Sequence, residues 1–224
     1  AWARTALDAW GQIDILVANA GARVNGSILE ATEEDWETIV NVNLKGVAYA
    51  CKATLPAMIA QKSGAIVMIS SANAKVGRSG MPLYDVTKAG VVSLAQSLAV
   101  AHGADGIRVN AICPGATSTP FSRKNFEAQA DPAAAEAAFS SRLPIGRFAR
   151  AEEQANAIAY LASDEAQNVN GRDFMIRAGA VGLYTIPTIE AQAFSPAAGW
   201  TNDDMFEVFP KTLGRLLKNE FEGR

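Results

Sequence analysis

The sequence predicts an α/β fold in which helices cover a parallel sheet, and two observations support this prediction. Short apolar runs alternate along the chain with longer segments of helical pattern, which is typical of parallel strands joined by helices. The chain has 224 residues, enough to bury one full core, and nothing in it demands a second. We therefore expect a single domain over residues 1–224.

The elements follow from local patterns. Four apolar runs are predicted to form strands: Ile13–Ala18, Ala65–Ile69, Ile107–Ile112 and the short Asp173–Ile176. Three segments have a helical pattern, from Glu33 to about Gln61, from Leu83 to about His102, and over Ala151–Ser163. Thr32 is expected to cap the first of these helices at its N-terminus, and Gly64 lies just past its end.

The first strand carries a further expectation. Ile13–Ala18 is a continuous apolar run, as in strands that are buried on both faces. Such a strand belongs in the middle of a sheet, yet no earlier strand precedes it and the sequence begins with Ala. We expect the sequence to start inside a larger domain, with residues 1–10 ending a helix that leads into a central strand.

Composition narrows the classes of function. Lys and Arg number 20 against 23 Asp and Glu, a net charge of -3, which argues against nucleic acid as the main partner. No apolar run is long enough to cross a membrane, and the first residues lack the pattern of a signal peptide. Cys51 and Cys113 lie far apart without metal-ligand spacing, which favours reduced thiols in a cytoplasmic protein. The sequence contains no His–carboxylate or Cys–His cluster, so we do not expect a catalytic metal.

The residues from Ala65 to Gly90 predict a site that handles protons. An apolar run ends at Ser70 and Ser71, and Tyr84 and Lys88 lie one helical turn apart, on one face of a helix. An unperturbed tyrosine has a pKa of about 10. A nearby ammonium is expected to lower that pKa toward the range of acid–base catalysis. For the Tyr–Lys pair alone, the alternative is a solvated lysine beside a half-buried tyrosine.

From Gly11 to Gly179 the chain resembles the short-chain dehydrogenase/reductase family in its compact form, a single Rossmann-type, doubly wound parallel sheet. The strand and turn motif of the family is matched by residues 11–21, GQIDILVANAG. Two further family motifs are matched by residues 41–46, NVNLKG, and residues 108–115, RVNAICPG. Tyr84 and Lys88 match the Tyr-x-x-x-Lys pair, and Ser71, thirteen residues before the tyrosine, matches the catalytic serine better than Ser70 does.

The resemblance implies hydride transfer between NAD or NADP and a small-molecule ketone or secondary alcohol. By this resemblance Tyr84 exchanges the proton, Ser71 holds the substrate oxygen, and Lys88 lowers the Tyr84 pKa and binds the ribose. Asn43 would anchor a water that connects Lys88 to solvent. The implied cofactor-binding residues are Asn19, Ala20, Gly21, Tyr84, Lys88, Pro114, Gly115 and Thr119.

Three departures from the family pattern leave alternatives open. Ala18 replaces the first Asn of the turn motif, and Gly179 and Ala180 stand where the family often closes with Asp-Gly-Gly. No Gly-rich phosphate-binding turn precedes the first strand, so we expect that N-terminal βα units, which would choose between NAD and NADP, are missing from this sequence. The rival hypothesis is a non-catalytic subunit of similar fold that acts as a binding or assembly partner. A reductase of carbon–carbon double bonds is a lesser alternative, because such relatives usually space the Tyr and Lys further apart.

The resemblance also assigns the remaining segments. Residues 117–150 are expected to form a substrate lid, and residues 182–224 a C-terminal extension that packs on something. The helix from Leu83 is rich in small residues, and with the helix before it is expected to form a homodimer or homotetramer; packing on its own sheet is the alternative. Basic side chains of the lid could attract an acidic or CoA-type substrate, but neighbouring acidic residues favour solvated charges. These basic residues are Arg123, Lys124, Arg142, Arg147 and Arg150.

Overall fold

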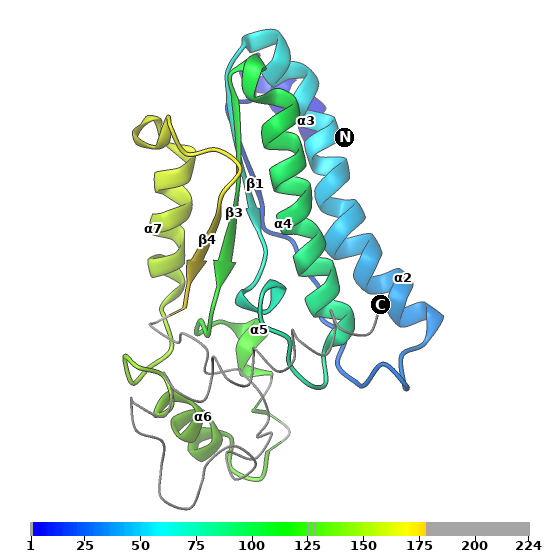
Figure 1. Cartoon of the computed structure of the whole chain (residues 1–224), viewed down its shortest axis with the longest axis vertical. Coiled ribbons are helices and arrows are strands. Elements are labelled where there is room, and N and C mark those ends of the chain that lie inside the picture. The colour runs from blue at the N-terminus through cyan, green and yellow to red at the C-terminus, as the bar shows by residue number, and fades with distance from the viewer. Residues whose placement is uncertain (1, 125, 128, 178–224) are drawn as a thin grey trace, which may run out of the picture. The chain divides into compact units, whose positions relative to one another are not determined.

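The computed structural model describes residues 2–124, 126–127 and 129–177. Its contacts divide the chain into residues 1–185 and 186–224, and the expected C-terminal extension, residues 182–224, lies outside the described residues. The described strands form one parallel sheet in the order β1-β2-β3-β4 (Figure 1). Their bounds are Ile15–Ala18 for β1, Gly64–Ile69 for β2, Ile107–Pro114 for β3 and Asp173–Ile176 for β4.

Helices connect these strands. Before β2 lie α1 (Trp2–Trp10), α2 (Glu33–Val40), the π-helical turn η1 (Asn41–Lys45) and α3 (Gly46–Gln61). Between β2 and β3 lie η2 (Ala72–Ala74), α4 (Pro82–His102) and η3 (Gly103–Asp105). After β3 come α5 (Pro120–Arg123), α6 (Pro132–Ser140), α7 (Ala151–Ala162) and η4 (Asp164–Ala166). The predicted strands and helices are thus present, with ends shifted by one or two residues apart from the long helix and the first strand.

The sheet is covered on both faces, as predicted for a doubly wound fold. Figure 1 shows α3 and α4 on one side of the sheet and α7 on the other. Alternate side chains of β2 pack against the helices on the two faces of the sheet, because successive residues of a strand point to opposite faces. Ile66 and Met68 pack with the α3 and α4 side, whereas Val67 packs with Ile112 and with Leu161 of α7. All five side chains are fully buried.

The first strand has a single neighbour in the described sheet. β1 lies at the edge of the described sheet and pairs with β2 alone. Leu16 and Ala18 are buried, but Ile15 is 50% and Val17 40% exposed. Within the described residues β1 is therefore an edge strand with one face partly exposed, and its central position in a larger domain stays a prediction. A continuous apolar run shows that both faces are apolar, whereas their coverage depends on which other elements lie beside them.

The long predicted helix is also divided. Thr32 caps α2 as expected, because its side chain accepts a hydrogen bond from the Asp35 amide at 3.1 Å and the Asp35 carboxylate accepts one from the Thr32 amide. The π-helical turn then separates α2 from α3. Such turns insert an extra residue into a helix and are frequent at functional sites. Here the turn contains Asn43, one of the predicted catalytic residues.

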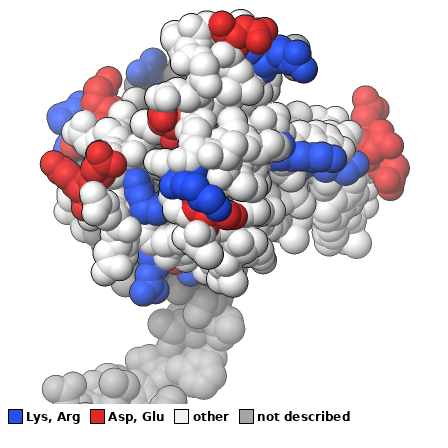
Figure 2. Space-filling model, turned by 90° about the horizontal axis from the view of Figure 1, so that it is seen from above, with Lys and Arg blue, Asp and Glu red and all other residues white. Residues whose placement is uncertain are grey.

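The face of the molecule in Figure 2 carries charges of both signs, and both cysteines are buried. Figure 2 looks onto the end of the molecule that lies at the top of Figure 1, and basic and acidic side chains are interspersed on that face. Cys51 and Cys113 are both buried free thiols. Within the described residues, no helix combines the length and hydrophobicity that a membrane span needs.

Candidate active site

The predicted site residues converge at the carboxyl end of the sheet. Because β1, β2 and β3 are parallel neighbours, the loops that follow them meet at one edge. Gly21 lies in the loop after β1, Ser71 is the second residue after β2, and Gly115 follows β3 directly. The first turns of α4 bring Tyr84 and Lys88 to the same region. In open parallel sheets this edge is the usual place for a ligand.

Lys88 is a buried lysine whose ammonium is held by the backbone. Its side chain is 3% exposed, and its Nζ donates a hydrogen bond to the Ile69 carbonyl at 2.7 Å. Burial disfavours the charged form and lowers the pKa of Lys88 from 10.5 to about 8. The position of Nζ is therefore fixed by the end of β2, the strand that leads into Ser71.

Tyr84 is 8% exposed, and its acidity differs from the prediction. Burial raises the pKa of Tyr84 above its ordinary value of 10.0, and it outweighs a hydrogen bond with the Ser71 side chain and the charges of Arg78 and Arg23, which lower that pKa. The Lys88 Nζ lies 5.7 Å from the centre of the ring. The expected lowering of the Tyr84 pKa is therefore wrong in direction, because desolvation of the phenolate exceeds the attraction of the neighbouring cations.

The two serines after β2 have different partners. The Ser70 hydroxyl donates to the Lys88 backbone carbonyl at 2.7 Å and so ties the end of β2 to α4. The Ser71 hydroxyl accepts from the Asn73 amide at 3.1 Å and shares a hydrogen bond with the Tyr84 side chain. Ser71 is thus the serine beside the phenol, and Ser70 has a structural partner.

Asn43 is completely buried and joins three segments. Its Oδ1 accepts from the Ala22 amide at 2.7 Å, and its Nδ2 donates to the Ala22 carbonyl at 3.1 Å and to the Thr87 hydroxyl at 3.2 Å. The Thr87 hydroxyl donates in turn to the Tyr84 carbonyl at 2.8 Å. The asparagine therefore fixes the loop after β1 against the turn of α4 that carries Tyr84 and Lys88.

Gly21 leaves room between two of these polar groups. A Cβ atom at this position would lie 3.5 Å from the Lys88 Nζ and 3.6 Å from the Asn43 Oδ1. A longer side chain would fill the space in front of both. A glycine at this position therefore lets the loop after β1 pass close to the Lys88 ammonium and the Asn43 amide. The two preceding residues, Asn19 and Ala20, are exposed.

The remaining predicted cofactor residues follow β3. Pro114 is the last residue of β3, and the Gly115 amide donates to the Ile176 carbonyl at 2.8 Å. A Cβ atom at Gly115 would lie only 2.6 Å from the Arg177 Cα, so the two backbones meet too closely for any other residue. Thr119 caps α5, with its hydroxyl accepting from the Ser122 amide at 3.2 Å. This capping contact gives Thr119 a structural role that its sequence position did not indicate.

Four residues beside Tyr84 escaped the sequence analysis. The Arg78 guanidinium lies 5.3 Å from the centre of the Tyr84 ring and pairs with Asp85 at 3.3 Å. Phe121, from α5, places its ring 6.2 Å from that of Tyr84, and the Arg23 guanidinium lies 4.3 Å from the Phe121 ring. Their only sequence signal is nearness to the motifs: Arg23 follows Gly21 by two residues, and Arg78 lies between Ser71 and Tyr84.

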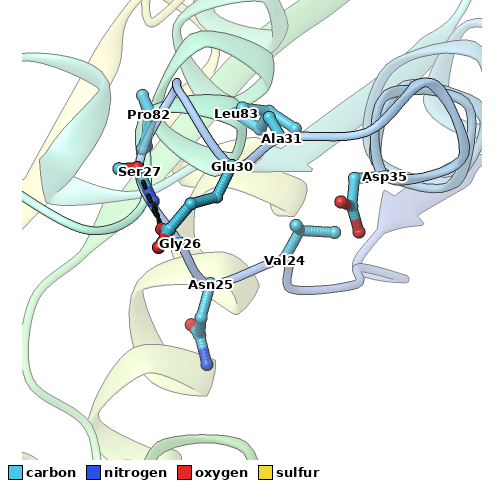
Figure 3. A pocket seen from close by; sticks show the side chains of 9 residues that line it. All are labelled: Val24, Asn25, Gly26, Ser27, Glu30, Ala31, Asp35, Pro82 and Leu83. Carbon is cyan, nitrogen blue, oxygen red and sulfur yellow. Dashed lines mark hydrogen bonds between the residues drawn. The ribbon is translucent and has the colours of Figure 1, made fainter.

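A small pocket lies next to this region, between the loop after β1 and the start of α4 (Figure 3). It is lined by residues 24–27, 30, 31, 35, 82 and 83, and its volume of about 20 Å³ suits a single water. Two acidic side chains line it, but the Glu30 carboxylate accepts from the Ser27 amide and the Asp35 carboxylate from the Thr32 amide. With this volume, the pocket is too small for a dinucleotide or a substrate.

Among the described residues no group of acidic, His and Cys side chains could hold a metal ion.

Comparisons with known proteins agree with this geometry. The family model described as Enoyl-(Acyl carrier protein) reductase matches residues 1–180. A dehydrogenase/reductase SDR family member 6 from Rattus norvegicus is 41% identical over 169 residues, which cover 75% of this chain and 69% of that protein. The chain belongs to the short-chain dehydrogenase/reductase family. It is therefore an NAD(P)-dependent oxidoreductase with a Rossmann-type fold.

Other family members resemble the chain to a similar degree. The 3-oxoacyl-(acyl-carrier-protein) reductase FabG of Thermotoga maritima is 40% identical over 172 residues, 77% of this chain and 68% of the reductase. The ligand-free aldohexose dehydrogenase of Thermoplasma acidophilum superposes with a TM-score of 0.76 at 31% identity, covering 80% of this chain and 71% of that one. A gluconate 5-dehydrogenase from Burkholderia cenocepacia, solved with NADP and tartrate, has a TM-score of 0.73 at 29% identity, covering 79% and 68%.

Proposed function

We propose that Tyr84 exchanges a proton with the oxygen of a ketone or secondary alcohol while a hydride passes between its carbon and NAD or NADP. The observation that carries this proposal is the cluster at the carboxyl end of the sheet. The Ser71 side chain is hydrogen-bonded to the Tyr84 side chain. The Lys88 ammonium donates a hydrogen bond to the carbonyl of Ile69, two residues before Ser71. The relatives named above are enzymes, so they lend no support to the rival non-catalytic subunit.

Tyr84 and Ser71 act on the substrate oxygen. In ketone reduction the Tyr84 hydroxyl gives its proton to that oxygen, and the Ser71 hydroxyl donates a hydrogen bond to the same atom. Such positioned proton transfer is worth about 10²–10⁴-fold in rate. Because burial raises its pKa, the Tyr84 phenol is protonated at neutral pH, which is the form that donates a proton.

Lys88, Asn43 and Gly21 fit the nicotinamide ribose. The Lys88 ammonium faces the space that a side chain at Gly21 would fill, so it can donate to ribose hydroxyls there. We propose that Asn43 positions a water through which Lys88 exchanges protons with solvent. The other proposed cofactor contacts are Asn19, Ala20, Tyr84, Pro114, Gly115 and Thr119. When bound, the nicotinamide supplies or accepts the hydride.

In our proposal, residues outside this cluster select the substrate. Residues 117–150 would act as the lid, since Phe121 of α5 already lies against Tyr84. The names of relatives range from a meso-2,3-butanediol dehydrogenase of Serratia marcescens to a cis-4-hydroxycyclohexanecarboxylate dehydrogenase of Sinomonas cyclohexanicum. These names include neutral and anionic compounds, so they do not single out one substrate for this chain.

We also propose a homodimer or homotetramer built on α3 and α4. Large apolar side chains are exposed on these helices: Tyr49 is 65%, Val86 52% and Val100 87% exposed. A charge at this surface should dissociate the assembly, so Val86→Lys is expected to lower the mass measured by light scattering after gel filtration. An unchanged mass would contradict this interface.

A cytoplasmic location is proposed from the two free thiols, Cys51 and Cys113.

The proton-transfer role is tested by Tyr84→Phe. We expect kcat to fall by at least about 10²-fold, because the ring is kept and the exchangeable proton is lost. NADH or NADPH binding, followed by nicotinamide fluorescence, should be nearly unchanged. Persistent turnover in the variant would show that another group handles the proton. Loss of cofactor binding would show that the substitution disturbs the fold of the site.

A further inference from the structure

A buried hydroxyl lies between the two predicted site residues of α4, at Thr87. This residue is 2% exposed, directly precedes Lys88 and follows Tyr84 by three residues. Its hydroxyl donates a hydrogen bond to the Tyr84 carbonyl at 2.8 Å and accepts one from the Asn43 Nδ2 at 3.2 Å. Thr87 therefore joins the helix of Tyr84 and Lys88 to the π-helical turn that contains Asn43.

The direction of these two bonds fixes how the Asn43 amide is turned. A threonine hydroxyl has one proton, and the Tyr84 carbonyl takes it, so toward Asn43 the hydroxyl can only accept. The nitrogen of the amide therefore faces Thr87. The Ala22 backbone favours the same orientation, because its carbonyl accepts from Nδ2 at 3.1 Å and its amide donates to Oδ1 at 2.7 Å. Both amide hydrogens of Asn43 are thus bonded, and its oxygen lies against the loop after β1.

The Asn43 oxygen and the Lys88 ammonium border the same space. A Cβ atom at Gly21 would lie 3.6 Å from the Asn43 Oδ1 and 3.5 Å from the Lys88 Nζ. An amide oxygen accepts a hydrogen bond from an ammonium or from a water beside it, whereas an amide nitrogen only donates. The orientation of the amide thus decides whether Lys88 has an acceptor or a second donor next to it.

We propose that Thr87 is a positioning residue for proton exchange at Lys88, and that it acts through the Asn43 amide. Its hydroxyl holds the amide with the oxygen on the Lys88 side, so that a water between the two groups has an acceptor and a donor in fixed places. The inference rests on the proposed function, to which it adds a residue that the sequence analysis did not single out.

A purely structural role would be that of a helix threonine that bonds only to its own helix. Thr54 in α3 is such a residue: it is fully buried, and its hydroxyl donates to the carbonyls of Ala50 and Cys51 at 3.2 Å and 3.3 Å. Such back-bonding fixes the side chain without involving another segment. Among the described residues Thr54 has no side-chain hydrogen-bond partner, whereas Thr87 has Asn43. Thr54→Val is therefore the matched control for Thr87→Val.

The test measures reduction of 2,3-butanedione, cyclohexanone and ethyl 3-oxobutanoate by the full chain with NADH and NADPH. Thr87→Val keeps the shape of the side chain and leaves one Asn43 amide hydrogen without its acceptor. We expect kcat to fall by about tenfold, because small displacements at a reacting site are costly. KM for the ketone and Kd for the cofactor should change by less than about threefold, since the Lys88 Nζ keeps its bond to the Ile69 carbonyl.

Three further variants control this result. Thr87→Ser keeps the hydroxyl and should retain kcat within about threefold. Thr87→Ala removes the hydroxyl without placing a methyl group against the amide, and should reproduce the loss even if Thr87→Val does not fold. Thr54→Val should lower the melting temperature to a similar extent as Thr87→Val but change kcat by less than about twofold.

A double-mutant cycle tests whether Thr87 acts through Asn43. Thr87→Val is measured in the parent protein and again in the Asn43→Ala variant. If Asn43 transmits the effect, the loss in kcat should shrink from about tenfold in the parent to less than about twofold in Asn43→Ala. A loss of equal size in both proteins would overturn the inference. An unchanged kcat in Thr87→Ala, or a loss as large in Thr54→Val, would overturn it as well.

Tyr84→Phe separates this inference from the function on which it rests. If Tyr84→Phe removes turnover but the cycle shows no coupling between Thr87 and Asn43, the inference is wrong and the proposed function stands. If Tyr84→Phe retains its turnover, or the parent protein reduces none of these ketones with either cofactor, the proposed function and the inference are both wrong.

Discussion

The inner cluster of Asn43, Ser71, Tyr84 and Lys88 differs in burial from the helices of the proposed lid over residues 117–150. All four inner side chains are less than a tenth exposed, and each has a polar partner. Neither helix of the lid, α5 or α6, contains a buried residue. This difference in burial suits the different tasks that we propose for the two regions. Groups that move a proton need fixed positions and a dry environment, whereas groups that select a substrate lie at the edge of the fold.

Gly115, where β3 leads toward the lid, offers the strongest test of this difference. In Gly115→Ala the new methyl group would lie 2.6 Å from the Arg177 Cα, so backbone must move. We expect the free energy of unfolding to fall by about 3 kcal/mol, measured in urea. Gly77→Ala is the matched control, because its methyl group would meet nothing within 4 Å. Its effect should stay within about 0.5 kcal/mol. Similar effects for the two variants would contradict a rigid boundary at Gly115.

Lys88 tests how dry the inner cluster is. Its pKa is lowered from 10.5 to about 8, so between these values the unfolded chain binds more protons than the folded chain. Stability from this group therefore rises with pH across that window and is constant below it. Relative to Lys88→Met, the free energy of unfolding of the parent protein should rise by roughly 2 kcal/mol from pH 7 to pH 10. A difference that does not change with pH would mean that the Lys88 ammonium is solvated.

The smallest effect is expected in the lid. Phe148 packs against Phe126 at 6.0 Å and Phe139 at 5.3 Å between ring centres. Phe148→Ala should loosen the lid and raise KM by a few-fold, with kcat changed by less than about twofold, because it removes binding rather than chemistry. The melting temperature of the sheet should change little. A large fall in kcat at unchanged KM would mean that the lid takes part in the chemical step.

Much of the site could be predicted from the sequence because its parts are local. The spacing of Tyr84 and Lys88 fixes their common face on one helix, wherever that helix lies. The Thr32 cap depends on contacts three residues away, and it is present as predicted, within a capping box that the structure adds. Loops after parallel strands must meet at one edge, so Gly21, Ser71 and Gly115 could be grouped before any coordinates were known.

Other features depend on residues far apart in the chain. The apolar run of β1 did not reveal that Ile15 and Val17 are exposed, since coverage depends on neighbouring elements. The Tyr84 pKa is raised because burial, a property of the whole packed site, exceeds the effect of nearby cations. Likewise, nothing in the spacing of Arg23 and Arg78 indicates that both act on Tyr84.

The sequence by itself determined the type of fold and the order of its elements, and it named the groups that we propose to handle the proton. It could do so because hydrophobic periodicity, helix caps and helical spacing act over a few residues. Only the tertiary structure decided how deeply Tyr84 and Lys88 are buried, how acidic they are and which cations surround them. Desolvation and charge–charge interactions are set by distances between segments that the chain brings together only when it folds.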